Sequence, residues 1–349
     1  MTKTGTGADD HILNPGKLPS AFLSRLLRAY RMSDPSVLVG PGVGRDAAAI
    51  AIGDETLVVK SDPITFATEN AASYLVNVNA NDVACLGAVP RWLTVTALLP
   101  HGKTTPALVE EQFRELHEAC AGIGVTLIGG HTEVTHGLDR PILVGHMLGI
   151  ARPAGLLMPG GARPGDQLLL TKAIAIEGTA LLARECPRGL GCALGQELVE
   201  RAQHLLHVPG ISVVPDADVV LKAGGITALH DPTEGGLATG VRELALAAGY
   251  GAALDVAAVP VLPETRAVAD HFGLEPCGML ASGALLAAAS PDAVSGIIDA
   301  CAAAGIPVAR IGTVEPEAHG FTWLRDGKVE ELPEFNQDEV SRVLAAGCA

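Results

Sequence analysis

Asn77-Val78-Asn79-Ala80-Asn81-Asp82 is the most informative stretch of this 349-residue chain. It lies within residues 71–87, where apolar side chains recur at helical spacing and predict a helix. Asn and Asp have poor helix propensity, so a purely structural helix would gain from their replacement. A buried carboxylate without a partner costs several kcal/mol or gives up its charge. The stretch therefore predicts a functional role for Asp82.

Further short motifs place polar groups among small apolar residues elsewhere in the chain. Several hard oxygen ligands together suit Mg²⁺, and the usual companion of Mg²⁺ is a polyphosphate, so the motifs indicate an enzyme that binds Mg-nucleotide. Lys60 is the best-placed base to offset phosphate charge, two residues before Asp62. The motifs are Gly44-Arg45-Asp46-Ala47-Ala48, Lys60-Ser61-Asp62-Pro63, Gly129-Gly130-His131-Thr132-Glu133 and Asp231-Pro232-Thr233-Glu234-Gly235-Gly236.

Each motif also has a simpler structural explanation. Asp46 and Asp62 lie beside turns, where Asp is common, although loop carboxylates there are also free to point into a cleft. The glycine pair 129–130 either lets a phosphate or base approach the backbone or forms a hairpin or bulge. Asp231 or Thr233 could cap a helix beginning near residue 234, whose N–H groups would then face an anion.

The length and texture of the chain predict two domains. A chain of 349 residues exceeds one ordinary core, and the Pro- and Gly-rich segment 151–166 is typical of a crossover between domains. Apolar periodicity predicts strands interspersed with helices, hence an α/β chain. The expected divisions are a lead-in at 1–17, an N-terminal domain at 18–152, a C-terminal domain at 160–332 and a tail at 333–349.

The expected elements follow from the same periodicity. The N-terminal half should hold helices from Ser20, at 71–87 and at 106–122, with strands at 57–60, 92–99, 125–128 and 142–150. The C-terminal half should hold helices near 177–185, 193–206, 235–249 and 291–304, with strands at 167–171, 252–256, 283–289 and 308–314.

Composition limits the class of protein. The formal net charge of -15 argues against nucleic-acid binding, because no basic stripe is present to contact phosphates. The 7 cysteines include no CxxC pair and are odd in number, which favours reduced cytosolic thiols over a disulfide framework. Residues 1–10 lack a signal-peptide core, and no stretch approaches the roughly 20 apolar residues of a membrane helix. We therefore expect a cytoplasmic protein without membrane or nucleic-acid partners.

Taken in order, the motifs resemble those of the ATP-binding superfamily of aminoimidazole ribonucleotide (AIR) synthetase, PurM. The P-loop, kinase and GxGxxG motifs are absent. Within the superfamily, the 231–236 run and the opening Lys17-Leu18-Pro19 look most like the hydrogenase-maturation carbamoyl dehydratases, HypE. The resemblance runs from about residue 17 to residue 331 and is most specific at 44–48, 61–62, 81–90, 129–130 and 231–236.

This resemblance implies a two-domain PurM-like α/β (α+β) subunit that binds ATP and Mg²⁺ in a cleft bordered by both domains. It also implies a homodimer whose interface is the N-terminal mixed sheet, and activation of an oxygen by the γ-phosphate of ATP. Carried over motif by motif, the catalytic residues would be Asp82, Glu133 and Asp231, the Mg²⁺ ligands Asp46, Asp62 and Asp82, and the ATP-binding residues Gly44, Asp46, Lys60, Asp62, Asn81, Gly129, Gly130 and His131.

The chain departs from the HypE pattern at two places. HypE proteins typically read Gly-Gly-Asp-Thr-Lys, whereas this chain has His131 and Glu133. In HypE the activated oxygen belongs to a thiocarboxamide on the C-terminal cysteine. HypE proteins end in Pro-Arg-Ile-Cys, whereas this chain continues after Pro333 to Cys348 and Ala349. The helical spacing of the tail shortens its reach, so we expect Cys348 to be an exposed cysteine and a poor carrier thiol.

Three functions therefore stay open. The first is a HypE-like enzyme acting on a small-molecule or carbamoyl-carrying acceptor. The second is a nucleotide-binding scaffold with weak chemistry that works with a maturation partner protein. The third is a small-molecule kinase or synthetase of the thiamine-monophosphate kinase, AIR synthase or selenophosphate synthetase type.

Overall fold

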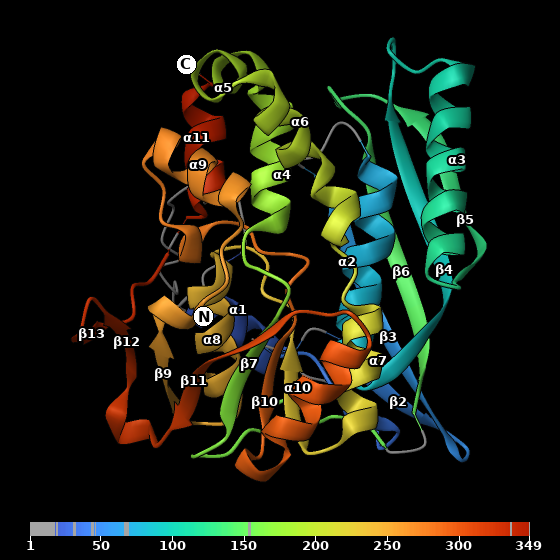
Figure 1. The fold of residues 1–349 in the computed structure, drawn as a ribbon. Helices are drawn as coiled ribbons and strands as arrows, with labels where there is room; N and C mark the ends of the chain where they lie inside the picture. The colour runs from blue at the N-terminus through green and yellow to red at the C-terminus, as the bar shows by residue number, and fades with distance from the viewer. Residues whose placement is uncertain are drawn as a thin grey trace, which may run out of the picture.

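The computed structural model contains two β-sheets, one in each half of the chain, with helices packed on both (Figure 1). The expected mixed α/β class is confirmed. No helix in the part of the chain that is described is long and apolar enough to cross a membrane. The structure describes residues 18, 20–30, 33–42, 45, 47–65, 70–152, 155–335 and 337–348.

The N-terminal sheet has the strand order β1-β2-β3-β6-β4-β5. Its neighbours are antiparallel except for β4 and β5, which run parallel. The strands are β1 (Val37–Val39), β2 (Ala48–Ile52), β3 (Glu55–Ile64), β4 (Ala88–Pro100), β5 (Thr126–Thr135) and β6 (Ile142–Ala151).

One face of this sheet is covered by α2 (Ala71–Cys85) and α3 (Pro106–Gly122), and α1 (Ser20–Ala29) precedes it. Glycines let α2 come close to β6, because a Cβ at Gly145 would overlap the side chain of Asn79 and one at Gly149 would overlap Val83. The opposite side of α2 contacts the second half of the molecule through α7 and β8, so α2 is buried almost throughout (Figure 1). Polar residues on α2 therefore lie at the junction of the two halves.

The other face of the N-terminal sheet carries half-exposed apolar side chains at alternate strand positions. The burial pattern of β6 shows this alternation, with buried residues facing α2 and half-exposed residues facing away. No described helix packs on this second face. Its apolar residues include Leu57 and Val59 of β3, Trp92 and Leu98 of β4, and Leu148 and Ile150 of β6.

The second sheet has the order β13-β12-β9-β11-β7-β10-β8. Helix α8 (Gly236–Ala247) packs in one core with this sheet, and α7 (Val214–Ala223) and α10 (Val294–Ala303) pack in another. The strands are β7 (Gln167–Thr171), β8 (Ile226–His230), β9 (Gly251–Asp255), β10 (Leu286–Ala289), β11 (Val308–Glu315), β12 (Phe321–Arg325) and β13 (Lys328–Glu331).

A separate helical group gathers at the end of the molecule where the C-terminus lies (Figure 1). It consists of α4 (Ile176–Glu185), α5 (Pro187–Leu194), α6 (Gln196–His204), α9 (Pro263–Phe272) and α11 (Glu339–Ala346). The remaining single turns are Leu206–Gly210, Val256–Ala258, Pro276–Gly278, Pro291–Ala293 and Glu317–His319. The tail after residue 333 thus contains the expected helix, and it is docked rather than free, with Val340 and Val343 buried.

Several sequence-based expectations are wrong in detail. The expected helix 193–206 is divided between α5 and α6, because Gly195 has a positive φ of 88° that ends the first helix. Helices α7 and α9 and strands β8, β12 and β13 were not expected, although α7 and α9 are as long as the expected helices α4 and α10. The 129–133 motif lies within β5 rather than after a strand, and a bulge is present at residue 128, directly before the glycine pair, opposite Leu93 and Thr94.

The expectation of seven reduced thiols is also wrong. Cys186 and Cys348 form a disulfide across a sequence separation of 162 residues. The fold brings the end of α11 to the junction of α4 and α5, a proximity that cysteine spacing cannot reveal. Cys348 is therefore half-buried and bonded, not an exposed free cysteine.

Candidate active site

Lys60, Asp62 and Asp82 form an ionic cluster where β3 meets α2. Lys60 and Asp62 are two residues apart on β3 and so share the face that packs on α2. The Nζ atom of Lys60 lies 2.7 Å from Oδ2 of Asp82 and 3.3 Å from Oδ2 of Asp62. The side chain of Asp82 is 6% exposed and that of Asp62 is 38% exposed. Two carboxylates thus converge on one cation, one from the interior and one from solvent.

Asn79 fixes Asp62 against α2. Its Oδ1 accepts a hydrogen bond of 2.9 Å from the backbone N–H of Asp62, and its Nδ2 donates to the carbonyl of Leu75 at 2.8 Å. Asn79 is fully buried, which explains why a poor helix former is present on this turn. Sequence reasoning did not single out this residue, although the run of Asn residues was the signal for it.

Asn81 connects the two halves of the chain. Its Nδ2 donates to the carbonyl of Ile211 at 2.9 Å, and its Oδ1 accepts from the N–H of Val213 at 2.8 Å. Both ends of the buried amide are therefore used by the backbone that precedes α7. The structure gives Asn81 a positioning role beside Asp82, and its expected contact with a nucleotide stays a prediction.

The 231–236 motif lies against the end of α2. Asp231 is 1% exposed, and the Sγ of Cys85, one turn beyond Asp82, donates to its Oδ1 at 3.8 Å. The expected capping by Asp231 or Thr233 is wrong, because α8 begins at Gly236 and has no side-chain cap. Instead, the N–H of Gly235 donates to the carboxylate of Asp338 at 2.8 Å. This carboxylate belongs to the tail of the same chain, and the expected contact of the 231–236 backbone with a bound anion stays a prediction.

A cavity of about 410 Å³ lies between these motifs. Asp62 lines one side of it, Thr233 and Glu234 line another, and α11 closes it. The other lining residues include Tyr74, Glu177, Ser282, Asp338, Val340, Ser341 and Leu344. The cavity therefore joins the 60–62 and 231–236 motifs, and we refer to it as the cleft.

The cleft is strongly acidic. The pKa of Glu177 is raised to about 7, mainly by burial and also by the nearby carboxylates of Asp338, Glu234 and Asp231, while a hydrogen bond with Ser282 lowers it. Burial likewise raises the pKa of Asp338 to about 6, although backbone N–H groups, including that of Gly235, hold the pKa down. A cation bound in the cleft would relieve this repulsion.

The 129–133 motif lies away from the cleft, at the far edge of the N-terminal sheet. Strands β6 and β4 separate β5 from β3. Nε2 of His131 lies 3.1 Å from Oε2 of Glu133, and both side chains are exposed. One protomer therefore does not bring Gly129, Gly130, His131 or Glu133 to Lys60, and their proposed roles stay predictions.

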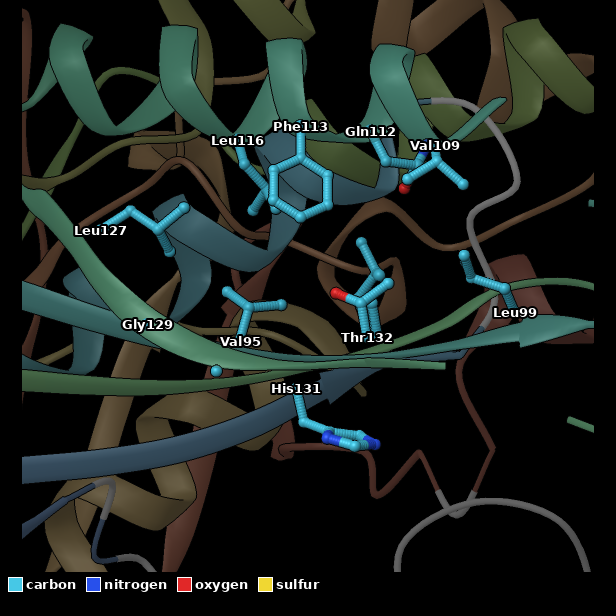
Figure 2. Close-up of a pocket in the computed structure, with 13 residues that line it drawn as sticks. Val95, Leu99, Val109, Gln112, Phe113, Leu116, Leu127, Gly129, His131 and Thr132 are labelled. Atoms are coloured by element: carbon cyan, nitrogen blue, oxygen red, sulfur yellow. The ribbon is translucent and has the colours of Figure 1, made fainter. Parts of the chain in front are cut away.

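A second cavity, of about 350 Å³, lies between α3 and strands β4 and β5. Figure 2 shows Phe113 and Leu116 pointing down from α3, with Thr132 pointing up toward them and His131 pointing the other way. This cavity is lined mainly by apolar side chains and does not include Lys60, Asp62 or Asp82.

The remaining predicted residues concern the nucleotide and the metal. Gly44 and Asp46 lie outside the described residues. In the part of the chain that is described, no three or more His, Cys, Asp or Glu side chains converge as a metal site. Mg²⁺ in nucleotide enzymes needs only one or two carboxylates, since phosphates and water complete its shell. The donor set of Asp62 and Asp82, already converging on a cation, fits such an ion.

Comparisons with known proteins place these features in a family. The family model for the N-terminal domain of AIR synthase related protein matches residues 44–151, and the C-terminal domain model matches residues 163–324. The carbamoyl dehydratase HypE of Cupriavidus necator is 32% identical over 81% of this chain and 80% of its own length.

Two solved structures share the fold. The structure of a HypE-HypF complex superimposes with a TM-score of 0.70 at 17% identity, covering 91% of this chain and 100% of the matched chain. The structure of hydrogenase maturation protein HypE in complex with ATP superimposes with a TM-score of 0.67 at 23% identity, covering 93% of this chain and 97% of the other.

Proposed function

The chain belongs to the AIR synthase-related (PurM) superfamily and is HypE-like within it, and from this we propose that it is an ATP- and Mg²⁺-dependent enzyme. The enzyme would activate an oxygen of a small-molecule or carbamoyl-carrying acceptor by transfer of the γ-phosphoryl group. The observation that carries the proposal is the convergence of Lys60, Asp62 and Asp82 beside a cleft bordered by both halves. The name and ATP complex of the relatives support the choice of nucleotide.

In such a site, different residues would bind the metal, contact the phosphates and position the backbone. Asp62 and Asp82 would hold Mg²⁺, which when bound neutralises phosphate charge. Lys60 would then turn toward the phosphates, since a metal ion competes with its ammonium group for the same two carboxylates. Asn79 and Asn81 keep β3, α2 and the segment before α7 in register. Positioning and charge neutralisation of this kind are the main contributions a protein makes to phosphoryl transfer.

The acceptor is expected to be separate from this chain's own tail. Cys348 is bonded to Cys186, so its sulfur is not available as a carrier thiol in this state. This observation favours a small molecule or a carbamoyl group delivered by another protein, and it keeps the scaffold function as the second candidate. A solved HypE-HypF complex supports a maturation partner protein.

The uncovered face of the N-terminal sheet supports a homodimer. A monomer would leave the apolar side chains of β3, β4 and β6 in water. A two-fold pairing of these faces would bury them and would bring His131 and Glu133, which lie on the same face, into the interface. We place the dimer in the cytoplasm, where a protein disulfide is typically transient or regulatory.

Calorimetry with ATP in the presence and absence of Mg²⁺ tests the proposal, together with ATP turnover with and without carbamoyl donors. Mg²⁺-dependent binding with acceptor-dependent turnover is expected for the enzyme. Binding without turnover by any acceptor would favour the scaffold. No ATP binding would contradict both.

A further inference from the structure

We propose that residues 338–348, here called the C-terminal latch, form a redox-controlled wall of the cleft. The Cys186–Cys348 disulfide would hold the latch closed, and reduction by a dithiol would release it and free the N–H of Gly235 for an anionic ligand. The identity of that ligand rests on the proposed function, whereas the latch itself rests on the contacts below.

The first contact holds the backbone N–H of Gly235 on the carboxylate of Asp338. Asp338 accepts hydrogen bonds of 2.8 Å from the N–H of Gly235 and 2.8 Å from the N–H of Val340. Gly235 directly precedes α8, a helix of 12 residues whose first turn has no side-chain cap. Its N–H therefore belongs to the positive end of a helix, where a ligand phosphate or carboxylate would compete directly with Asp338.

The second contact is the wall made by α11. Val340, Ser341 and Leu344 line the cleft from this helix. Helix α11 is seated closely on α4, because a Cβ at Gly178 would overlap the side chain of Val340 and the carbonyl of Leu280. Displacing α11 would therefore remove one whole side of the cleft.

Besides its packing in the helical core, the latch is anchored by hydrogen bonds, one of them from the N–H of Leu280 to Asp338. Beyond Asp338, the N–H of Glu275 donates to Glu339 at 3.3 Å, and Arg342 donates to the carbonyl of Gly273 at 3.1 Å. Helix α11 has 8 residues, of which Val340 and Val343 are buried. So short a helix is marginal in isolation, so its retention depends on these contacts and on the covalent link at its end.

The two cysteines of the disulfide differ in exposure, so a reductant would reach the bond at Cys348. Cys186 is 2% exposed at the end of α4, whereas Cys348 is half-buried. A dithiol reductant would attack Sγ of Cys348 as a thiolate, and the Sγ of Cys186 would leave. The second thiol of the reductant would then displace Cys348 from the mixed disulfide. The net reaction converts one protein disulfide and one dithiol into two protein thiols and one cyclic disulfide.

Hydrogen exchange of the whole chain tests the latch without any ligand. The protein is measured after air oxidation and after reduction with dithiothreitol, with disulfide content checked by alkylation and mass. We expect peptides covering 338–346 and 231–236 to exchange at least tenfold faster after reduction. Cys348→Ser should match the reduced wild type in either condition. Cys192→Ser, which removes an exposed free thiol on the neighbouring α5, should behave as wild type.

Binding of the ATP analogue AMPPCP with Mg²⁺ gives the second readout. We expect at least tenfold tighter binding to reduced protein and to Cys348→Ser than to oxidised wild type. Faster exchange without AMPPCP binding in either state would uphold the latch and contradict the proposed nucleotide. Unchanged exchange on reduction, or seven alkylatable thiols in air-oxidised protein, would overturn the latch.

Discussion

The ammonium group of Lys60 lies 2.7 Å from the carboxylate of Asp82, which joins the middle of β3 to the last turn of a buried helix. The same ammonium lies 3.3 Å from Asp62. The side chain of Asp82 is buried, whereas that of Asp62 is 38% exposed. Replacing Asp82 should therefore affect both folding and binding, whereas replacing Asp62 should affect binding alone.

Asp62→Asn should fold normally and bind Mg-ATP at least tenfold more weakly, because it removes one half-exposed carboxylate from the proposed metal site. Asp82→Asn should also weaken binding, but it removes the nearer carboxylate from the Lys60 ammonium, whose side chain is only 15% exposed, and should lower the free energy of unfolding by about 3 kcal/mol. Denaturant titration and calorimetry measure the two effects. Wild-type ATP affinity in Asp62→Asn would contradict the assignment.

Asn81→Leu should destabilise the protein by about 2–4 kcal/mol, because it leaves the backbone groups of Ile211 and Val213 unsatisfied in the interior. Asn77→Ala is the matched control on the same helix. The Nδ2 of Asn77 donates only to its own helix, at Ser73, so this change should cost less than about 1 kcal/mol. Urea unfolding of both variants provides the measurement, and equal losses would be inconsistent with an interdomain role.

Stability should fall as pH rises through the range in which Glu177 ionises. Its pKa is raised to about 7 in the folded protein from an ordinary value of 4.5. The folded state therefore binds more protons at Glu177 than the unfolded state between these values, so the contribution of Glu177 to stability is fully present below about 4.5 and is lost as pH rises through about 7. Glu177→Gln should flatten this part of the profile, whereas Glu185→Gln, exposed on the same helix, should not. Thermal unfolding from pH 5 to pH 8 provides the measurement. If stability falls with pH as steeply in Glu177→Gln as in the wild type, another group is responsible.

Leu148→Arg should convert a dimer to a monomer with little loss of fold, because Leu148 lies on the uncovered face of the N-terminal sheet. Leu246→Arg places the same charge on an exposed position of α8 and should remain dimeric. Light scattering at micromolar concentration distinguishes the two. A monomeric wild type would rule out the proposed dimer.

Gly130→Ala should destabilise the protein more than Gly129→Ala. Both glycines have φ near +150°, so any side chain is strained by about 1–3 kcal/mol at either position. Only at residue 130 would a Cβ also overlap the backbone of Val95 on the adjacent strand, whereas the space beside residue 129 is open. Equal melting temperatures for the two variants would indicate that β5 moves away from β4.

Local sequence patterns were sufficient to predict the class of fold and to identify Asp82 as a carboxylate that needs a partner. The helix at 71–87 and the strand at 142–150 depend on neighbouring residues, so both could be predicted from the sequence and both are present. A carboxylate on a helix buried all round required a partner, which the structure supplies to Asp82 as Lys60.

The tertiary structure alone decided which groups meet. Asn81 contacts residues about 130 positions away, Gly235 contacts Asp338 103 positions away, and Cys186 bonds Cys348 across 162 positions. Spacing along a chain carries no information at such separations, because the partner is chosen by how whole layers pack. The sequence therefore predicted a nucleotide site with carboxylates, and packing decided that the chain's own tail forms one wall of the cleft beside Asp62.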